Sequence, residues 1–265
     1  MKKDRLIDKN NITFLQKVLL LIMNIQNWYM IIPDKLGVKP YINYKTRKGL
    51  SIICRSKSTD INELVAVISG AEYPKKFIKL NDNDNVFDLG ANIGGFTLYV
   101  DQINKNVNYQ GYAFEPFEQN FRILKKNCKL NKLTNFSLHT EAVSGKNGVV
   151  YMDVDCLPDR VSILHNKKGR VSTKSVKLST FCDKNKINNI SLIKMDIEGS
   201  EYDVFSEDLK FISDKVNRII LEYHNLDSKH NKRWILKSLS PYFRFTNIYD
   251  ARNYGVIYAE NRKRI

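Results

Sequence analysis

The sequence has few of the residues from which compact metal and redox sites are built. Its 265 residues include only four cysteines, and no two of them form a Cys-x-x-Cys pair. Zinc ribbons and dithiol redox motifs are built on such pairs, so the sequence argues against both. Nothing in it demands disulfides, and this cysteine usage fits a reducing cytoplasm.

Long apolar runs are missing as well. The most apolar stretch, residues 12–32, is interrupted by Gln16, Lys17, Asn24, Gln26 and Asn27. A transmembrane helix needs about 20 predominantly apolar residues, and a signal peptide needs a small-residue cleavage site, so neither is predicted. A Gly-Lys-Ser/Thr sequence is also absent, which argues against a phosphate-cradling P-loop.

Positive charge, by contrast, is abundant. The chain carries 43 basic and 28 acidic residues, a formal net charge of +15, within a composition that is otherwise typical of a globular protein. Such an excess favours anionic partners, such as nucleic acid or an acidic membrane face. Because the lysines are spread along the chain, we interpret the charge as that of a soluble enzyme from a lysine-rich proteome.

The first 80 residues are predicted to form an N-terminal extension, with the main domain at residues 81–265. Apolar residues at helical spacing between Phe14 and Ile25 predict an amphipathic helix. Residues 12–36 then either pack on the core or make peripheral contact with a membrane. The expected location is therefore cytoplasmic, with a peripheral membrane position as the alternative.

Three further features are expected in the extension. Pro33 and the segment Gly37-Val38-Lys39-Pro40 are expected to break the first helices, and a short hairpin is expected from residues 41–44 and 50–54. Asp60 is expected to N-cap a helix that ends near Ser69.

From Asn85 onward, short apolar strands alternate with amphipathic helices. Strands are predicted at residues 86–89, 109–114, 136–143, 190–195, 218–223, 243–249 and 254–259. Strands separated by helices imply a parallel, doubly wound α/β sheet with right-handed crossovers, and the last hairpin adds one antiparallel strand. An antiparallel excursion is expected between residues 147 and 178. It contains Arg160 and Ser162, and we expect it to cover the substrate.

The strongest local motif is the glycine turn Asp88-Leu89-Gly90-Ala91-Asn92-Ile93-Gly94-Gly95-Phe96, between a strand and a helix. Glycines let a ligand approach the backbone there, and the helix N-terminus offers free N–H groups. The glycine spacing departs from the Gly-x-Gly-x-x-Gly of dinucleotide folds. Glu115 ends the next strand, where a carboxylate can accept hydrogen bonds from both ribose hydroxyls. Glu115 thus supports an adenosine ligand, either a nicotinamide dinucleotide or S-adenosylmethionine.

Four segments make the chain similar to the FkbM family of S-adenosylmethionine-dependent methyltransferases. They are the turn at residues 87–97, the strand end Phe114-Glu115-Pro116, residues 192–201, and Leu221-Glu222-Tyr223-His224. The pattern Lys194-x-Asp196-x-Glu198-Gly199-x-Glu201 is specific to that family, whereas the glycine turn is shared by many methyltransferases. The likeness spans about residues 60–260.

The resemblance implies a fold, a cofactor and site residues. The fold is a seven-stranded, Rossmann-like methyltransferase sheet, and the cofactor is S-adenosylmethionine. Asp88, Gly90, Asn92, Gly94, Gly95 and Phe96 would line its methionine end, Glu115 would hold its ribose, and Glu141 and Ala142 would lie near its adenine. Asp196 and Glu198 would face the transferred methyl group. The implied chemistry is methyl transfer to the hydroxyl of a glycan or another small metabolite.

Charged residues gather at two adjacent strand ends. Asp196 ends a buried strand, and Glu222 and His224 share one side-chain parity at the end of the next strand. Asp196 is the first candidate for the base and His224 the second; alternatively, Asp196, Glu222 and His224 hold a divalent metal. The metal-free version is favoured, because only strand parity supports the metal. Lys194, inside an apolar strand, needs one of these carboxylates as its partner.

Two other functions are alternatives to this one. An RNA methyltransferase would suit the positive charge. However, the fourth strand does not end in Asn/Asp-Pro-Pro-Tyr/Phe, and an acidic cleft repels phosphates, so nucleic acid is not the predicted partner. A protein that only binds the cofactor is the second alternative, and the intact glycine turn and acidic strand ends argue against it.

Overall fold

A seven-stranded sheet forms the centre of the molecule in the computed structural model, which describes residues 13–153, 162–164 and 171–264. Its strand order is β12-β13-β11-β10-β3-β4-β5. The strands are β3 (Asn85–Leu89), β4 (Gln110–Phe114), β5 (Phe136–His139), β10 (Leu192–Met195), β11 (Arg218–His224), β12 (Phe243–Asp250) and β13 (Tyr254–Asn261). Strand β13 alone runs opposite to the other six strands, and it pairs antiparallel with β11 and β12. The predicted doubly wound sheet is thereby confirmed.

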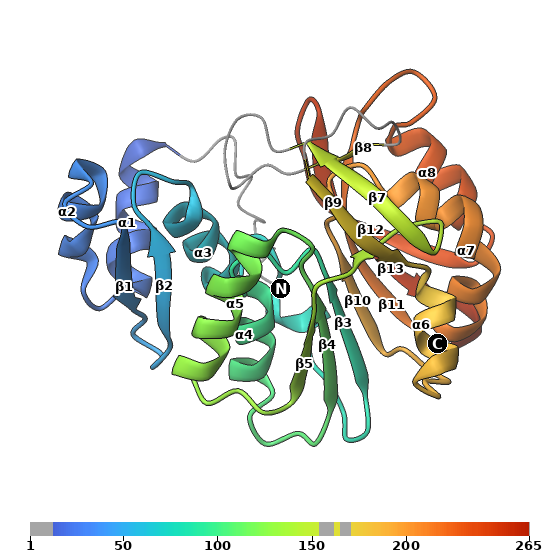
Figure 1. Ribbon diagram of the computed structural model, residues 1–265, viewed down its shortest axis with the longest axis horizontal. Coiled ribbons are helices and arrows are strands. Elements are labelled where there is room, and N and C mark those ends of the chain that lie inside the picture. The colour runs from blue at the N-terminus through green and yellow to red at the C-terminus, as the bar shows by residue number, and fades with distance from the viewer. Residues whose placement is uncertain (1–12, 154–161, 165–170, 265) are drawn as a thin grey trace, which may run out of the picture.

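Helices cover both faces of this sheet (Figure 1). Helices α3 (Asp60–Ser69) and α4 (Gly95–Ile103) contribute to one apolar core, while α6 (Leu178–Lys184), α7 (Glu201–Lys215) and α8 (Lys232–Leu239) contribute to another. Helix α5 (Glu118–Leu130) contributes Leu124 and Cys128 to a third, smaller apolar cluster. Neighbouring strand residues face opposite cores: Val86 belongs to the first and Phe87 to the second. Because both faces of the sheet are buried, the central strands have continuous apolar sequences.

The N-terminal extension precedes this sheet. It comprises α1 (Phe14–Asn24), the 3-10 turn η2 (Trp28–Met30), α2 (Ile31–Leu36) and the hairpin β1 (Tyr41–Lys45) with β2 (Ser51–Arg55). The break after α1 comes at Ile25, which is buried and pairs with Thr46. The expectation that Pro33 breaks a helix is wrong. Pro33 lies in the first turn of α2, where its missing N–H costs no hydrogen bond.

A second, four-stranded sheet has the order β6-β9-β7-β8. Its strands are β6 (Ala142–Val143), β7 (Gly148–Asp153), β8 (Ser162–Leu164) and β9 (Val171–Val176). The antiparallel pairing of β7 with β9 matches the predicted excursion. Ser162 begins β8, while Arg160 lies outside the described residues. The predicted strand at residues 136–143 is wrong in one respect: it divides into β5 and β6, which belong to different sheets.

Two short 3-10 turns, η3 (Lys75–Phe77) and η4 (Arg262–Arg264), complete the described elements. Among the described residues, no helix has the length and apolar character needed to cross a membrane.

Candidate active site

The glycine turn joins β3 to α4 at the carboxyl ends of the parallel strands. Gly90 has a φ of 80°, and a Cβ at this position would lie 1.8 Å from the backbone oxygen of Asp196. Gly94, with a φ of 94°, caps α4, and a Cβ there would lie 2.8 Å from Leu124 Cδ1. Both positions therefore need glycine for their backbone conformation and for close packing against protein atoms.

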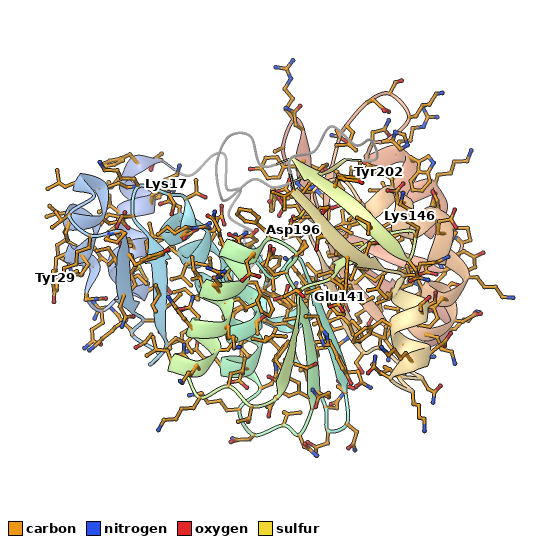
Figure 2. All side chains as sticks on the ribbon, in the orientation of Figure 1. Lys17, Tyr29, Glu141, Lys146, Asp196 and Tyr202 are labelled. Atoms are coloured by element: carbon orange, nitrogen blue, oxygen red, sulfur yellow. The ribbon has the colours of Figure 1, made fainter. Side chains whose placement is uncertain are left out.

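A cavity of about 1250 Å³ lies beside this turn. The N-terminal extension, the turn, β10, β11 and the loop between β12 and β13 all contribute to its wall. The predicted residues that line it are Gly90, Asn92, Gly95, Phe96, Lys194, Asp196, Glu198, Glu222 and His224. In Figure 2, Asp196 lies near the centre of the molecule, just beyond the end of β10. The structure thus brings all the predicted catalytic residues to one cavity.

A second, smaller cavity lies on the other side of the turn. Glu115, Ala142 and Met152 contribute to its wall. Gly90, Asn92, Asp196 and Glu198 line both cavities, so the two meet between the glycine turn and the Asp196 strand end. Such an arrangement can hold an extended ligand against the turn, at the carboxyl ends of the strands where ligands of doubly wound sheets bind.

Three of the predicted cofactor residues, Asp88, Gly94 and Glu141, line neither cavity. Asp88 lies fully buried beneath the turn, and Gly94 faces Leu124 instead. Glu141 follows the end of β5 and precedes β6 (Figure 2). Glu141 lies in the connection between two sheets, where the sequence predicted one continuous strand. Only the next residue, Ala142, reaches the cavity wall.

Glu115 is buried at the end of β4 and held by three donors. The backbone N–H groups of Asn92 and Phe117 donate to its two oxygens at 2.8 and 2.9 Å, and the Asn120 amide donates at 3.4 Å. Burial raises the pKa of Glu115 to about 7, although the backbone N–H bonds oppose that shift. A carboxylate oriented in this way fits the hydroxyls of a ribose, which donate hydrogen bonds and bring no countercharge.

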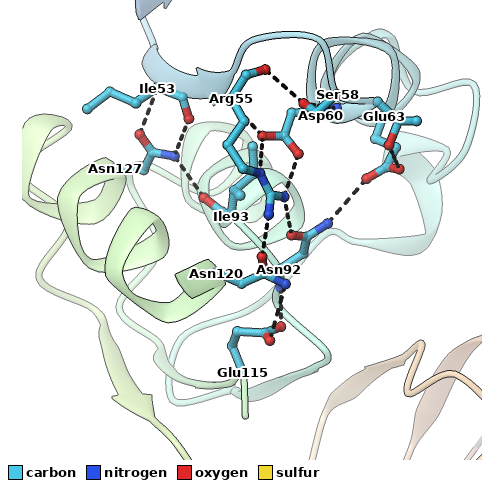
Figure 3. Close-up of polar contacts among 11 residues, drawn as sticks. Ile53, Arg55, Ser58, Asp60, Glu63, Asn92, Ile93, Glu115, Asn120 and Asn127 are labelled. Carbon is cyan, nitrogen blue, oxygen red and sulfur yellow. Dashed lines mark hydrogen bonds and ion pairs between the residues drawn. The ribbon is translucent and has the colours of Figure 1, made fainter. Parts of the chain in front are cut away.

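The donors to Glu115 belong to a network that begins in the N-terminal extension (Figure 3). Arg55 Nη1 donates to the Asn120 oxygen at 2.7 Å, and Arg55 Nη2 donates to the Asn92 oxygen at 3.5 Å. The Asn92 amide in turn donates to Glu63 at 3.2 Å. Asn92 is thus held from both sides in the left-handed conformation, with a φ of 48°, which costs free energy in a non-glycine residue.

Asp60 is the carboxylate partner of Arg55. It accepts from Arg55 Nε at 2.9 Å and from Arg55 Nη2 at 2.6 Å, and it is fully buried. The expectation that Asp60 N-caps α3 is wrong. Thr59 occupies that position, and Asp60 is the first helical residue. The buried, bidentate ion pair uses the fork geometry that distinguishes arginine from lysine.

Lys194 lies buried between two carboxylates. Its Nζ is 3.5 Å from Asp88 Oδ1 and 3.6 Å from Asp196 Oδ2, and it donates to the Gly90 carbonyl at 2.7 Å. Burial lowers the pKa of Lys194, but the charges of Asp196 and Asp88 outweigh burial, and the net shift is upward. Lys194 therefore stays charged and ties the glycine turn to the Asp196 strand end. Asp196 is one of the strand-end carboxylates that were predicted as possible partners of Lys194, whereas Asp88 was not among them.

The turn after Asp196 is stabilised by Glu201. This buried carboxylate accepts from the N–H groups of Ile197 at 3.0 Å and Gly199 at 2.9 Å. The turn presents Glu198, whose φ is 50°, to the cavity. Burial and the nearby Asp196 carboxylate raise the pKa of Glu198 to about 7. A residue that titrates near neutral pH can accept a proton during a reaction.

His224 is surrounded by acids. Its Nε2 lies 3.4 Å from Glu198 Oε2 and 3.9 Å from Glu222 Oε1, and its Nδ1 lies 3.5 Å from Glu201 Oε1. Burial lowers the pKa of His224, but the carboxylates of Glu201, Asp196 and Glu198 outweigh it and raise the pKa to about 10. The imidazole is therefore protonated at neutral pH, and in this state it cannot accept a proton from a substrate.

One metal-compatible group is present among the described residues. Asp196, Glu198 and His224 each offer an atom within 4.8 Å of the others. The predicted set had Glu222 in the place of Glu198. Two carboxylates and an imidazole are suitable ligands for a divalent ion, provided that the imidazole is neutral.

The part of the site that the N-terminal extension supplies was not predicted from the sequence. Arg55, Glu63 and Asn120 carry no motif, and Arg55 meets Asn120 across 65 positions of sequence. A lone arginine beside Asp60 gives no local signal of a partner that distant.

Comparison with known proteins assigns the chain to a family. The model of the methyltransferase FkbM domain matches residues 88–251, more than half of the chain. The 31-O-demethyl-FK506 methyltransferase FkbM of Streptomyces tacrolimicus is 25% identical over 191 residues, which cover 58% of this chain and 71% of that protein. The crystal structure of a methyltransferase FkbM from Methylobacillus flagellatus superposes with a TM-score of 0.50 at 15% identity. That match covers 77% of this chain and 55% of the solved one, so this chain spans just over half the length of the solved protein. The chain therefore belongs to the FkbM family of S-adenosylmethionine-dependent methyltransferases.

Proposed function

We propose that this protein transfers the methyl group of S-adenosylmethionine to a hydroxyl oxygen of a glycan or another small metabolite. The observation that carries the proposal is the place of Asp196. Its side chain is 27% exposed, lines the cavity, and follows the strand next to the glycine turn. A carboxylate in this position can take a proton from a hydroxyl group in the cavity.

The residues around the turn would hold the cofactor. Gly90, Asn92, Gly95 and Phe96 would contact its methionine end, and the Glu115 carboxylate would accept hydrogen bonds from its ribose. Ala142, in the smaller cavity with Glu115, would lie near its adenine. When bound, the cofactor supplies a methyl group that is already activated by the sulfonium. The protein therefore has to position the acceptor and handle one proton.

In this proposal Asp196 orients the acceptor hydroxyl and removes its proton. Lys194 is a positioning residue, since it holds the Asp196 strand end against the Gly90 carbonyl. Glu198, with its pKa of about 7, is the second candidate for the base. The protonated His224 limits the repulsion between Glu198, Glu201 and Glu222. In this role His224 stabilises the site by its charge and is not a base.

We favour a mechanism without a metal ion. A divalent ion held by Asp196, by Glu198 or Glu222, and by His224 would have to displace a proton from an imidazole whose pKa is about 10. The cost of that displacement weakens the site at neutral pH. If a metal does bind, it would polarise the acceptor hydroxyl, and chelation would then abolish turnover.

The acceptor is proposed to be uncharged or cationic rather than a nucleic acid. Carboxylates dominate the charged groups that line the cavity, namely Asp60, Glu63, Glu72, Asp196, Glu198, Glu222 and Asp250. A negative wall repels a phosphate backbone. We also propose a cytoplasmic location, because Cys54, Cys128 and Cys182 are free thiols.

The proposal is tested by measuring the transfer of a labelled methyl group from S-adenosylmethionine to panels of glycans, polyhydroxylated metabolites and RNA. Transfer to a hydroxyl compound is expected, and a base-stable methyl ether should be recovered. Transfer to RNA, or to nitrogen or carbon of a small molecule, would refute it. A protein that binds the cofactor tightly but methylates none of the panels would instead support the non-catalytic alternative.

A further inference from the structure

Exposed apolar side chains are concentrated in the N-terminal extension. Among the described residues, ten large apolar side chains are exposed between residues 14 and 41, and three elsewhere. The ten are Phe14, Leu15, Leu19, Met23, Trp28, Tyr29, Ile32, Leu36, Val38 and Tyr41. We refer to them as the N-terminal face. Monomeric proteins seldom expose so much apolar surface in one region unless a partner covers it.

Helix α1 shows the imbalance most clearly, because none of its residues is buried. Leu15 and Met23 are 67% and 68% exposed. Its other side faces inward, where Leu20 and Leu21 pack against the core. Figure 1 shows α1 and α2 together at one end of the molecule, beyond the seven-stranded sheet. The extension therefore covers the core with one side and leaves the opposite side to a partner.

Within residues 13–48, which carry this face, the exposed charged side chains are all basic. Between residues 13 and 48 the only acidic residue is Asp34, which is fully buried and accepts a hydrogen bond from Tyr44. The exposed basic residues of that segment are Lys17, Lys35, Lys39, Lys45, Arg47 and Lys48. Apolar side chains combined with lysines match a bilayer that carries anionic headgroups, to which each basic side chain adds attraction.

Aromatic side chains strengthen this match. Trp28, Tyr29 and Tyr41 are 39%, 57% and 48% exposed. Tyr29 points outward at the end of the molecule in Figure 2. Tryptophan and tyrosine favour the boundary between acyl chains and headgroups, because an apolar ring can be buried there while its polar atom stays hydrated.

The same segment also forms part of the active-site cavity. Val18 and Leu21 of α1, with Ile31 and Lys35 of α2, line the cavity that contains Asp196. We propose that the N-terminal face docks on an anionic membrane surface and thereby brings the cavity to the lipid. The inference that docking presents a membrane-borne hydroxyl acceptor to the active site rests on the proposed function. The docking itself does not depend on that function.

Flotation of the full chain with phosphatidylcholine vesicles, with and without phosphatidylglycerol, tests the docking. Binding is expected only to the anionic vesicles and should weaken as salt is raised. Leu15→Glu with Met23→Glu should reduce the affinity by about tenfold or more, because the double change removes apolar contact and adds negative charge. Val149→Glu is the matched control: Val149 is 53% exposed on β7, in the second sheet and outside the N-terminal extension, and this variant should float like the wild type.

Two further measurements make the result decisive. Calorimetric binding of S-adenosylhomocysteine should be equal in the wild type and in both variants, so the loss of flotation cannot be attributed to misfolding or to an error in the proposed function. Size-exclusion chromatography tests the other occupant of an apolar face, a second copy of the chain. A wild type that does not float and runs as a dimer, with a monomeric double variant, would overturn the proposal. Equal flotation of the wild type and the double variant would overturn it too.

Discussion

Arg55 Nη1 donates a 2.7 Å hydrogen bond to the side-chain oxygen of Asn120 and so turns the Asn120 nitrogen toward Glu115. An amide has one acceptor end and one donor end, so fixing the first fixes the second. Arg55 belongs to the N-terminal extension and Glu115 to the methyltransferase sheet. The extension is therefore connected to the residue that is proposed to hold the ribose.

This relationship predicts that Arg55 supports cofactor binding without touching the cofactor. Arg55→Gln alone would leave Asp60 as a buried, unpaired charge, which costs about 3–5 kcal/mol of stability. The better variant combines Arg55→Gln with Asp60→Asn, which removes both charges. We expect S-adenosylhomocysteine to bind it about threefold to tenfold more weakly by calorimetry, the effect of losing about one oriented hydrogen bond.

The control for this prediction is Arg218→Gln. Arg218 is also partly buried and donates to the carbonyls of Ser191 and Lys79, but it lies at the opposite end of the strands. Its loss should lower the melting temperature and leave the affinity unchanged. A double variant at Arg55 and Asp60 that is folded and binds normally would show that the network serves stability alone.

The pH dependence of cofactor binding should report on Glu115. Burial raises the pKa of Glu115 to about 7 in the free protein. Ribose hydroxyls donate to the ionised carboxylate, so binding favours loss of the proton. Affinity should therefore fall as the pH is lowered from 8 to 6, while the bound state lowers the pKa of Glu115. Calorimetry across this range, in buffers of different ionisation enthalpy, should also detect proton release on binding below pH 7.

Glu115→Gln separates this effect from that of Glu198, whose pKa is also about 7. The variant should bind about tenfold more weakly at pH 8, where a charged acceptor is lost. Its affinity should vary less with pH than that of the wild type. If the two proteins have pH profiles of the same shape, the titrating group is not Glu115.

Gly90 and Gly95 make a matched pair for testing the turn. A Cβ at Gly90 would lie 1.8 Å from the Asp196 oxygen at a φ of 80°, whereas a Cβ at Gly95 would lie 3.9 Å from Val67. Gly90→Ala should destabilise the protein by at least about 2 kcal/mol, since backbone strain and a clash add together. Gly95→Ala should be tolerated to within about 1 kcal/mol. Urea denaturation measures the stability of both variants. Equal unfolding midpoints for the two variants would mean that the Asp196 carbonyl does not lie so close to Gly90.

The alternation of strands and helices let the sequence predict most of the sheet, because strands buried on both faces read as apolar runs. The break between β5 and β6 could not be predicted this way. Residues 136–143 keep a strand-like pattern throughout, and only the pairing of Ala142 and Val143 with β9 assigns the last part to another sheet. The role of Asp60 was predicted wrongly for a similar reason. An acid at a helix start resembles a cap, and its true partner, Arg55, is revealed only when β2 folds back beside α3.

The site itself was predicted unevenly. The charged strand ends could be located from the sequence, because parallel strands that end together bring their last residues to one edge. The charge state of His224 could not be predicted from the sequence. It depends on Glu201, which is buried in the folded chain with its carboxylate 3.5 Å from the imidazole.

The central prediction concerns Asp196. If its carboxylate takes the proton of the acceptor hydroxyl, Asp196→Asn should bind S-adenosylhomocysteine normally, since the proposed cofactor contacts lie on the glycine turn and at Glu115. Its kcat should fall by roughly 10²–10⁴-fold, the usual contribution of acid–base catalysis. Glu198→Gln is the neighbouring control: the same cavity loses one carboxylate, but Asp196, the proposed base, remains, so a smaller loss is expected.

The metal alternative gives a different pattern with the same variants. If Asp196, Glu198 and His224 hold a divalent ion, then Asp196→Asn and Glu198→Gln should lose activity to a similar extent, because each removes one of three ligands. Chelation would then abolish the activity of the wild type, and added Mg²⁺ or Mn²⁺ would restore it. In the metal-free mechanism chelators leave the activity unchanged.

In the metal-free mechanism, raising the pH toward 10 tests the role of His224. As His224 loses its proton, its charge no longer offsets the neighbouring carboxylates, so the stability that it contributes at neutral pH should decline. An Asp196→Asn protein with normal turnover would contradict both mechanisms and leave the positioning of the acceptor as the protein's whole contribution to the rate.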